Sequence, residues 1–274
     1  MPRPGSSSQR LNPAAWHPAI VALALLPALV GLAFILWTHS IWEDYLITYR
    51  HSENLVLGHG LVYQPGERVH GFTSVINTLL PALPRWFGAD LTTALAFYQF
   101  CSLGALSVGL AALLRELRAR CGYSWSALAG IAVLVAASTK IVAFSSNGQE
   151  GGFLVCFLCL GLVGALRLAG AQDWRILGVA SAGLLYTRPD SPLYVLILVG
   201  IAFTCCDGAF RRLLVPLFKA ALLAVVLYLP WFLIAWWYYG SPVPHTIVAK
   251  ASGNLLIEGS VLKTLLAVSP QFVM

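Results

Sequence analysis

Charged residues are scarce in this sequence. Only 10% of its 274 residues are Asp, Glu, Lys or Arg, and 58% are hydrophobic, whereas a soluble domain has about 25% charged residues. So few charges cannot cover a water-soluble globule, which excludes a soluble enzyme, a nucleic-acid-binding module and a disordered chain. Segments that alternate polar and apolar residues are missing too, which argues against a transmembrane β-barrel. The sequence therefore predicts an all-α polytopic membrane protein, because helices satisfy their own backbone groups in lipid.

The cysteines do not indicate a disulfide framework. Five of the six lie in or beside apolar runs, and Cys121 lies in a loop. Cys156 and Cys159 have the spacing of metal and redox sites, but no other potential ligand lies near them in the sequence. We therefore expect this pair to pack in the core. Basic residues are scattered at segment ends, so the net charge of +6 indicates topology rather than a nucleic-acid partner.

Apolar runs long enough for membrane spans recur along the chain. The first, 19–38, has the ~20 residues needed to cross ~30 Å of hydrocarbon, and it is longer than the apolar core of a signal peptide. We expect it to be an uncleaved span after a flexible basic N-terminus, 1–18, and to open a transmembrane domain over 19–274. Seven further runs bring the prediction to about eight spans: 91–114, 123–144, 151–168, 175–187, 190–206, 213–238 and 255–268.

The stretch 72–88 is apolar but is not predicted to span. It contains Pro81, Pro84 and Arg85, and counting it as a span would reverse the orientation of everything after it. We expect a helix lying along the outer membrane surface, with a re-entrant segment as the alternative.

Arginines predict the orientation. The positive-inside rule places three arginine-rich loops in the cytoplasm; they contain Arg115, Arg118, Arg120, Arg167, Arg175, Arg211 and Arg212. The first outer loop is then 39–90. Eight of the eleven acidic residues and five of the six histidines fall on or near the outer side. Groups suited to chemistry are therefore expected at the extracytoplasmic face.

Two adjacent carboxylates, Glu43 and Asp44, follow the first span. If 44–57 is helical, Asp44, Thr48 and His51 share one face, while Tyr45 and Tyr49 lean toward the membrane interface. A carboxylate held within hydrogen-bond reach of an acceptor hydroxyl can remove its proton. The pair can equally mark the water boundary of the span, and spacing alone leaves both interpretations open.

Several motifs occur in the order seen in a known family. Residues 43–50 read Glu-Asp-Tyr-Leu-Ile-Thr-Tyr-Arg and are followed by 54–63 and 65–69; the later pieces are 147–152, 185–190 and 239–250. Together they resemble GT-C glycosyltransferases, closest to the bacterial branch that includes the mycobacterial cell-wall arabinofuranosyltransferases. The resemblance covers roughly residues 19–255. It implies a GT-C-like transmembrane helix bundle in the bacterial inner membrane, with juxtamembrane helices in a long first extracytoplasmic loop.

The resemblance also implies an activity at the extracytoplasmic face. It is transfer of a sugar from a polyprenyl-phosphate donor to an envelope glycan, glycolipid or protein acceptor, with Asp44 as catalytic base and Glu43 beside it. Relatives usually have two aspartates there, and they differ again at 70–72 and at His245; these changes affect substrate identity rather than fold. Relatives also continue through more spans, so we expect this chain to be incomplete at its C-terminus.

The donor's phosphate would need cations, because fixed positive charge stabilises a departing lipid phosphate. The candidates are Arg68, Arg188, His245 and Lys250. The alternatives are a structural pair of Arg188 with Glu150 or Asp190, and a solvated loop around His245 and Lys250. The supporting candidates are Arg50, His59, Glu67, Glu150 and Asp190, with Arg50–Glu53 expected to be a helix-surface pair and Gln149 and Glu150 expected to hydrogen-bond the first loop.

A metal site and two other functions stay open. Mg²⁺ or Mn²⁺ would need several oxygen ligands, of which Glu43 and Asp44 could supply two. A transporter or lipid flippase would place broken helices and ionisable residues near mid-membrane. Most of the predicted spans lack such charges, and Lys140 near a span end is the closest case. A non-catalytic envelope-assembly subunit is the third alternative. Membrane lipids are expected partners in each case.

Overall fold

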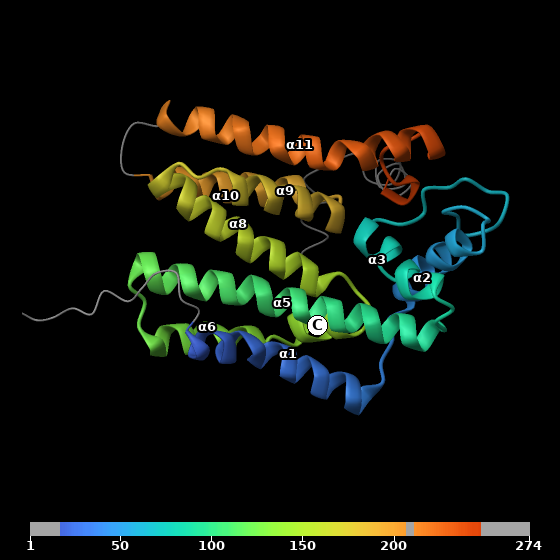
Figure 1. Ribbon diagram of the computed structural model, residues 1–274, viewed down its shortest axis with the longest axis horizontal. Coiled ribbons are helices and arrows are strands. Elements are labelled where there is room, and N and C mark those ends of the chain that lie inside the picture. The colour runs from blue at the N-terminus through green and yellow to red at the C-terminus, as the bar shows by residue number, and fades with distance from the viewer. Residues whose placement is uncertain (1–16, 207–210, 248–274) are drawn as a thin grey trace, which may run out of the picture.

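All the secondary structure that the computed structural model describes is helical (Figure 1). The description covers residues 17–206 and 211–247; the predicted N-terminal segment, except for its last two residues, and the predicted run 255–268 lie outside it. The helices are α1 (Pro18–Thr38), α2 (Glu43–Val56), α3 (Val75–Leu79), α4 (Ala82–Trp86), α5 (Leu91–Cys121), α6 (Trp125–Ala137), α7 (Thr139–Ser146), α8 (Gly151–Ala171), α9 (Arg175–Thr187), α10 (Ser191–Thr204) and α11 (Arg211–Tyr239).

Four of these helices, α1, α5, α8 and α11, are long and apolar enough to cross a membrane. A fifth crossing is possible if α6 and α7 form one span, bent by 62° at its break. The helices α9 and α10 have 13 and 14 residues, or about 20 Å each, which is shorter than the ~30 Å hydrocarbon layer. The described part therefore has four or five such helices, where the sequence predicted seven spans over the same residues.

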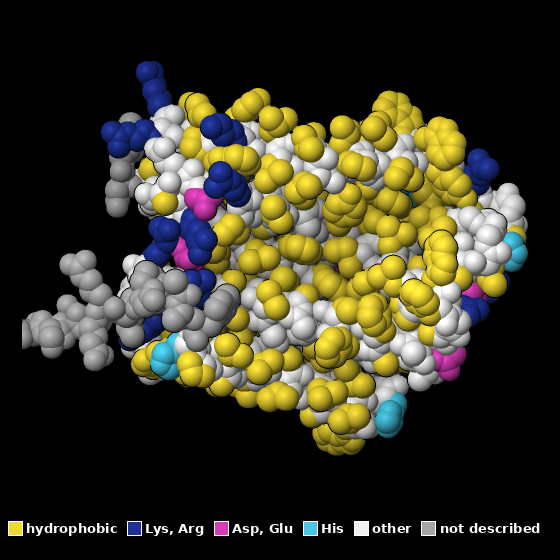
Figure 2. Space-filling view, viewed as in Figure 1, with side chains coloured by type: hydrophobic (Ala, Val, Ile, Leu, Met, Phe, Trp, Pro, Cys, Tyr) yellow, Lys and Arg dark blue, Asp and Glu magenta, His cyan; other side chains and the backbone are white. Residues whose placement is uncertain are grey.

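The long helices run back and forth between two ends of the bundle (Figure 1). The connections α5–α6 and α8–α9, the end of α10 and the start of α11 lie at one end, where lysine and arginine side chains gather (Figure 2). The helices α2 and α3 lie at the opposite end (Figure 1). The segments predicted to carry cytoplasmic arginines thus share one end, and the predicted first outer loop lies at the other.

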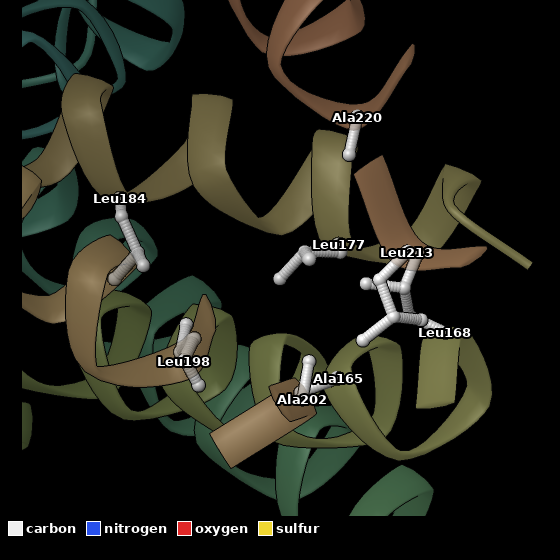
Figure 3. Close-up of a cluster of buried hydrophobic side chains, with 8 residues drawn as sticks. All are labelled: Ala165, Leu168, Leu177, Leu184, Leu198, Ala202, Leu213 and Ala220. Atoms are coloured by element: carbon white, nitrogen blue, oxygen red, sulfur yellow. The ribbon is translucent and has the colours of Figure 1, made fainter. Parts of the chain in front are cut away.

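Close packing among α8, α9, α10 and α11 accommodates the two short helices. Their buried side chains form one cluster (Figure 3): Ala165, Leu168, Leu177, Leu184, Leu198, Ala202, Leu213 and Ala220. Gly164 lets α9 approach α8, because an added Cβ there would lie 2.5 Å from the Leu177 backbone nitrogen. Cys156 and Cys159 are buried free thiols on α8, which confirms that this pair packs in the core.

The structure of the first loop agrees with some of the predictions made from its sequence and contradicts one. The helix that the argument on Asp44, Thr48 and His51 required over 44–57 is present as α2. The stretch 72–88 forms two five-residue helices, α3 and α4, which are too short to cross a membrane. The prediction for Tyr45 and Tyr49 was wrong: both are buried, with the Tyr45 ring centroid 5.7 Å from that of Tyr98. Packing of α2 against the start of α5 takes them away from the interface.

Candidate functional site

A cavity of about 660 Å³ lies at the end of the bundle that carries α2 and α3. Ligand pockets commonly measure roughly 300–1,000 Å³. Its walls come from segments far apart in the sequence: α2, residues 71–74, Asn77 of α3, 149–150, 188–190 and 246–247. The fold therefore brings the motif-bearing segments of the first loop, the α7–α8 loop, the α9–α10 loop and the chain after α11 to one place.

Asp44 lies at this cavity in the first turn of α2. The partial positive charge of a helix N-terminus favours a carboxylate there, and the Asp44 Oδ2 accepts a hydrogen bond from the Gln149 Nε2 at 3.4 Å. The helical period also brings Ile47 and Thr48 to the cavity wall. Glu43 is about 100° away around the helix. Of the two carboxylates, only Asp44 is among the described residues that line the cavity.

His51, predicted to share the face of Asp44, lies behind the wall. Its ring is buried, and its Nδ1 donates to the Ile47 carbonyl at 2.8 Å. The Nε2 has no hydrogen-bond partner among the described residues, and it lies 3.4 Å from where a Cβ on Gly71 would be. Burial lowers the pKa of His51, so its ring is neutral at physiological pH.

Arg188 lies between two carboxylates on the cavity wall. Its Nη1 donates to the Glu150 Oε1 at 2.9 Å, and its Nε and Nη2 donate to the two Asp190 oxygens at 2.8 and 3.3 Å. Both structural pairs that the sequence left as alternatives are therefore present. Burial raises the pKa of Glu150 above that of an ordinary glutamate, although the Arg188 charge opposes the shift.

Asn77 connects this group to α3. Its Nδ2 donates to the Glu150 Oε2 at 3.2 Å and to the Gly148 carbonyl at 3.4 Å, and its Oδ1 accepts from the Tyr98 hydroxyl. These bonds, with Gln149–Asp44, confirm that Gln149 and Glu150 hold the first loop. Sequence analysis missed Asn77 and Tyr98. A lone amide inside the apolar stretch 72–88 was the available signal, because a buried amide needs partners.

The other predicted cations lie elsewhere. The Arg68 guanidinium is 5.0 Å from the centroid of the Tyr238 ring, and Arg68 is not among the described cavity-lining residues. The His245 Nδ1 accepts a hydrogen bond from the His70 backbone N–H at 3.1 Å. Lys250 lies outside the described residues. Of the four predicted phosphate ligands, Arg188 is thus the one that the described structure places on the cavity wall.

The remaining supporting candidates are also apart from the cavity. Arg50 and Glu53 form the predicted helix-surface pair, with Nη1 and Oε2 at 2.8 Å. The His59 Nδ1 lies 3.4 Å from the Asn54 Oδ1. Glu67 is exposed in the loop before α3.

The described cavity wall carries more negative than positive charge. Asp44, Glu150 and Asp190 contribute three carboxylates and Arg188 one guanidinium, a formal charge of −2 when all four are ionised. Within residues 17–206 and 211–247, no three His, Cys, Asp or Glu side chains are grouped closely enough to hold a metal ion. Metal binding by Glu43 and Asp44 therefore stays a prediction.

Neither a family model, nor a curated protein, nor a solved structure matches the chain. The resemblance to GT-C glycosyltransferases stays a prediction that depends on the quoted motifs.

Proposed function

We propose that the protein is a membrane glycosyltransferase of the GT-C type. It transfers a sugar from a polyprenyl-phosphate donor to a cell-envelope acceptor at the extracytoplasmic face of the bacterial inner membrane. The observation that carries the proposal is the position of Asp44. This carboxylate follows the first candidate span directly and lines a cavity large enough for a sugar. The motifs that resemble the family supply the walls of the same cavity.

Asp44 acts as the general base in this proposal. Its carboxylate accepts the proton of the acceptor hydroxyl, and the acceptor oxygen forms a bond to the anomeric carbon of the donor sugar. The bond between that carbon and the phosphate oxygen breaks, and its electron pair leaves with the polyprenyl phosphate. The hydrogen bond from Gln149 fixes the orientation of the carboxylate, because a base must be held within reach of the proton it removes.

Arg188 supplies positive charge for the departing phosphate. It already binds Glu150 and Asp190, so the phosphate shares or displaces one of these carboxylates. Arg188 is the one Lys or Arg on the described wall, so it orients the donor: the phosphate lies toward Arg188 and the sugar toward Asp44. A guanidinium suits this task, since its planar set of donors matches the oxygens of carboxylate and phosphate alike.

The orientation in the membrane follows the positive-inside rule. The end with the arginine-rich connections lies in the cytoplasm, and the cavity end lies outside. This places Asp44 where a polyprenyl-phosphate sugar and an envelope acceptor can meet outside the cytoplasm.

The test is a transfer assay with purified full-length protein in lipid nanodiscs and a polyprenyl-phosphate sugar donor. Asp44→Asn keeps the size of the side chain but removes the basic carboxylate. A general base contributes typically about 10²–10⁴-fold, so we expect transfer to fall by about that factor while donor binding persists. Glu43→Gln is the matched control: it removes the neighbouring carboxylate, which does not line the described cavity, and we expect it to retain most activity.

Two results would contradict the assignment of Asp44. If Glu43→Gln abolished transfer and Asp44→Asn did not, the base would be Glu43. If neither variant changed the rate of an active protein, proton removal in the first loop would not be the mechanism.

A transporter or lipid flippase is the second candidate, and one feature favours it. The helices α6 and α7 are separated by Ser138 and bent by 62°, and broken helices are typical of transporter binding sites. The ionisable groups described above lie instead at the end of the bundle. Proteoliposomes that move a lipid or solute without transferring sugar would favour this second function.

A further inference from the structure

The chain after α11 folds back onto the first loop through two histidines. The His70 backbone N–H donates to the His245 Nδ1 at 3.1 Å, and the His245 backbone N–H donates to the His70 carbonyl at 3.0 Å. This reciprocal pair joins residues 175 positions apart in the sequence. The residues directly beside it, Gly71 and Phe72 on one side and Thr246 on the other, line the cavity. The pair therefore fixes the distance between two cavity walls.

Aromatic packing buries one side of this contact. The His70 ring stacks on Tyr239 of α11, with centroids 4.7 Å apart and planes 10° from parallel. Phe72 lies against both His70 and His51, with centroid distances of 4.9 and 5.0 Å. His51, His70 and Phe72 are all less than 3% exposed. The buried rings of His51 and His70 therefore both pack on Phe72, next to the hydrogen bonds that join residues 70 and 245.

We propose that His70 and His245 are positioning residues that form a latch: they hold the segment after α11 against the first loop, fix the cavity wall at Thr246 and Ile247, and release it on protonation. The proposal concerns the shape of the cavity and does not depend on the reaction performed there.

The hydrogen bond explains why protonation opens the latch. Because the His245 Nδ1 accepts the His70 N–H, the neutral ring carries its proton on Nε2. A second proton on Nδ1 would place one N–H against another and remove the bond. Among the described residues, the groups that surround the latch do not neutralise added charge: α2 presents His51, the first loop presents Arg68, and α11 presents Tyr238 and Tyr239. On α2 the carboxylate at the cavity, that of Asp44, lies seven residues before His51.

The burial of His70 also predicts that the latch weakens as the pH falls. Burial lowers the pKa of His70 to about 4, despite a hydrogen bond with the Ser241 backbone, and the neighbouring His245 and His51 lower it further. When the segment opens, the ring returns to water and to a pKa of about 6.5. The open state then binds more protons between about pH 6.5 and pH 4, so the latch is at full strength above that window and weakens as the pH falls through it.

Hydrogen exchange tests the latch without any substrate. The full-length protein in lipid nanodiscs is compared at pH 7.5 and pH 5.5, and exchange of peptides over 68–74 and 241–247 is corrected for the intrinsic rate. One histidine with these two pKa values predicts a loss of protection of about tenfold at pH 5.5. Peptides from α8 serve as the internal reference and should not change.

Two variants separate the latch from general packing. In His70→Phe/His245→Asn, the phenyl ring preserves the stacking, and the amide oxygen at position 245 accepts the backbone N–H of position 70 at every pH. We expect protection at pH 7.5 as in the wild type and a much smaller loss at pH 5.5. His245→Ala should have low protection in both peptides at both pH values. His39→Asn is the matched control for an exposed histidine, and it should behave as the wild type.

The proposal fails if the wild type has equal protection at both pH values, or if the double variant loses as much protection as the wild type. If the double variant also loses protection in α8, it is not folded, and His70→Phe alone, which removes the buried imidazole but keeps the stacking, takes its place. That single variant must then lose less protection than the wild type at pH 5.5, and an equal loss would overturn the proposal.

Discussion

The two ends of the bundle each hold a carboxylate among arginines, and they use it differently. At the arginine-rich end, Glu116 of α5 has a side chain only 5% exposed and contacts Arg120 and Arg167. At the cavity end, Glu150 is 12% exposed and contacts Arg188. Both carboxylates are removed from water, and each is tolerated because a guanidinium lies beside it.

The difference is in the ratio of charges. Glu116 has two arginines for one carboxylate, and the Arg167 Nε and Nη2 both donate to its Oε2, at 3.0 and 2.7 Å. Arg188 is shared by two carboxylates, Glu150 and Asp190, on the wall of the 660 Å³ cavity. A carboxylate with two cations ties α5 to α8, whereas one cation shared by two carboxylates can exchange a partner for a ligand. The same chemistry therefore stabilises the fold at one end and is available for binding at the other.

Among variants that compare the two ends of the bundle, the largest effect is expected from Arg188→Ala. A hydrogen bond to a charged group contributes roughly 1.5–3 kcal/mol, so donor use, measured as kcat/KM, should fall by about ten- to a hundredfold. Arg68→Ala is the matched control, because Arg68 lies over the Tyr238 ring, and its donor KM should be unchanged. Equal losses in the two variants would contradict the difference assigned to these arginines.

The same Arg188 variant should have a pH-dependent stability. Without the guanidinium, Glu150 keeps its raised pKa and loses the charge that opposes the shift. The ionised carboxylate is then unpaired at high pH, and protonation removes this cost as the pH falls through its pKa. We expect the deficit in melting temperature relative to the wild type to be larger at pH 8 than at pH 5. A deficit that grows as the pH falls would contradict the pairing.

Glu116→Gln is expected to lower stability and to leave transfer unchanged. It leaves Arg120 and Arg167 beside a neutral amide, so the free energy of unfolding should fall by about 1.5–3 kcal/mol and the melting temperature by several degrees. Transfer per folded molecule and donor KM should not change, because this end is remote from the cavity (Figure 1). Glu67→Gln, at an exposed glutamate, is the matched control and should leave the melting temperature, transfer and donor KM unchanged. A raised donor KM in Glu116→Gln would mean that the two ends are coupled.

The sequence predicted the features that depend on local pattern. Apolar run length located α1, α5, α8 and α11, and the arginine distribution correctly grouped three arginine-rich segments at one end. A helix over 44–57 was a condition of the argument, and the pairing of Arg188 with Glu150 or Asp190 was one of two alternatives; the structure contains the helix and both pairs. Each of these follows from hydrophobicity or from charges that cannot remain unpaired away from water.

Features that depend on tertiary packing were not predictable in the same way. The run at 123–144 divides at Ser138, and hydropathy does not report a bend of 62°. The prediction that Tyr45 and Tyr49 lie at the membrane interface was wrong because α5 buries them, and the sequence does not indicate where α5 packs. Asn77 acquired its role from Tyr98 and Glu150, which are distant in the sequence. Arg68 and Arg188 had the same predicted role as phosphate ligands, because only the fold of the first loop determines that Arg68 lies over Tyr238 and not on the described cavity wall.

The position of the bound donor would show most directly whether the cavity, and not the arginine-rich end, is the donor site. Cryo-electron microscopy of the full-length Asp44→Asn variant with a polyprenyl-phosphate sugar would show it. We expect the phosphate to contact Arg188 and the sugar to lie in the cavity, with its anomeric carbon facing position 44. A donor phosphate bound among Arg120, Arg167 and their neighbours at the opposite end, with the cavity unoccupied, would contradict this expectation.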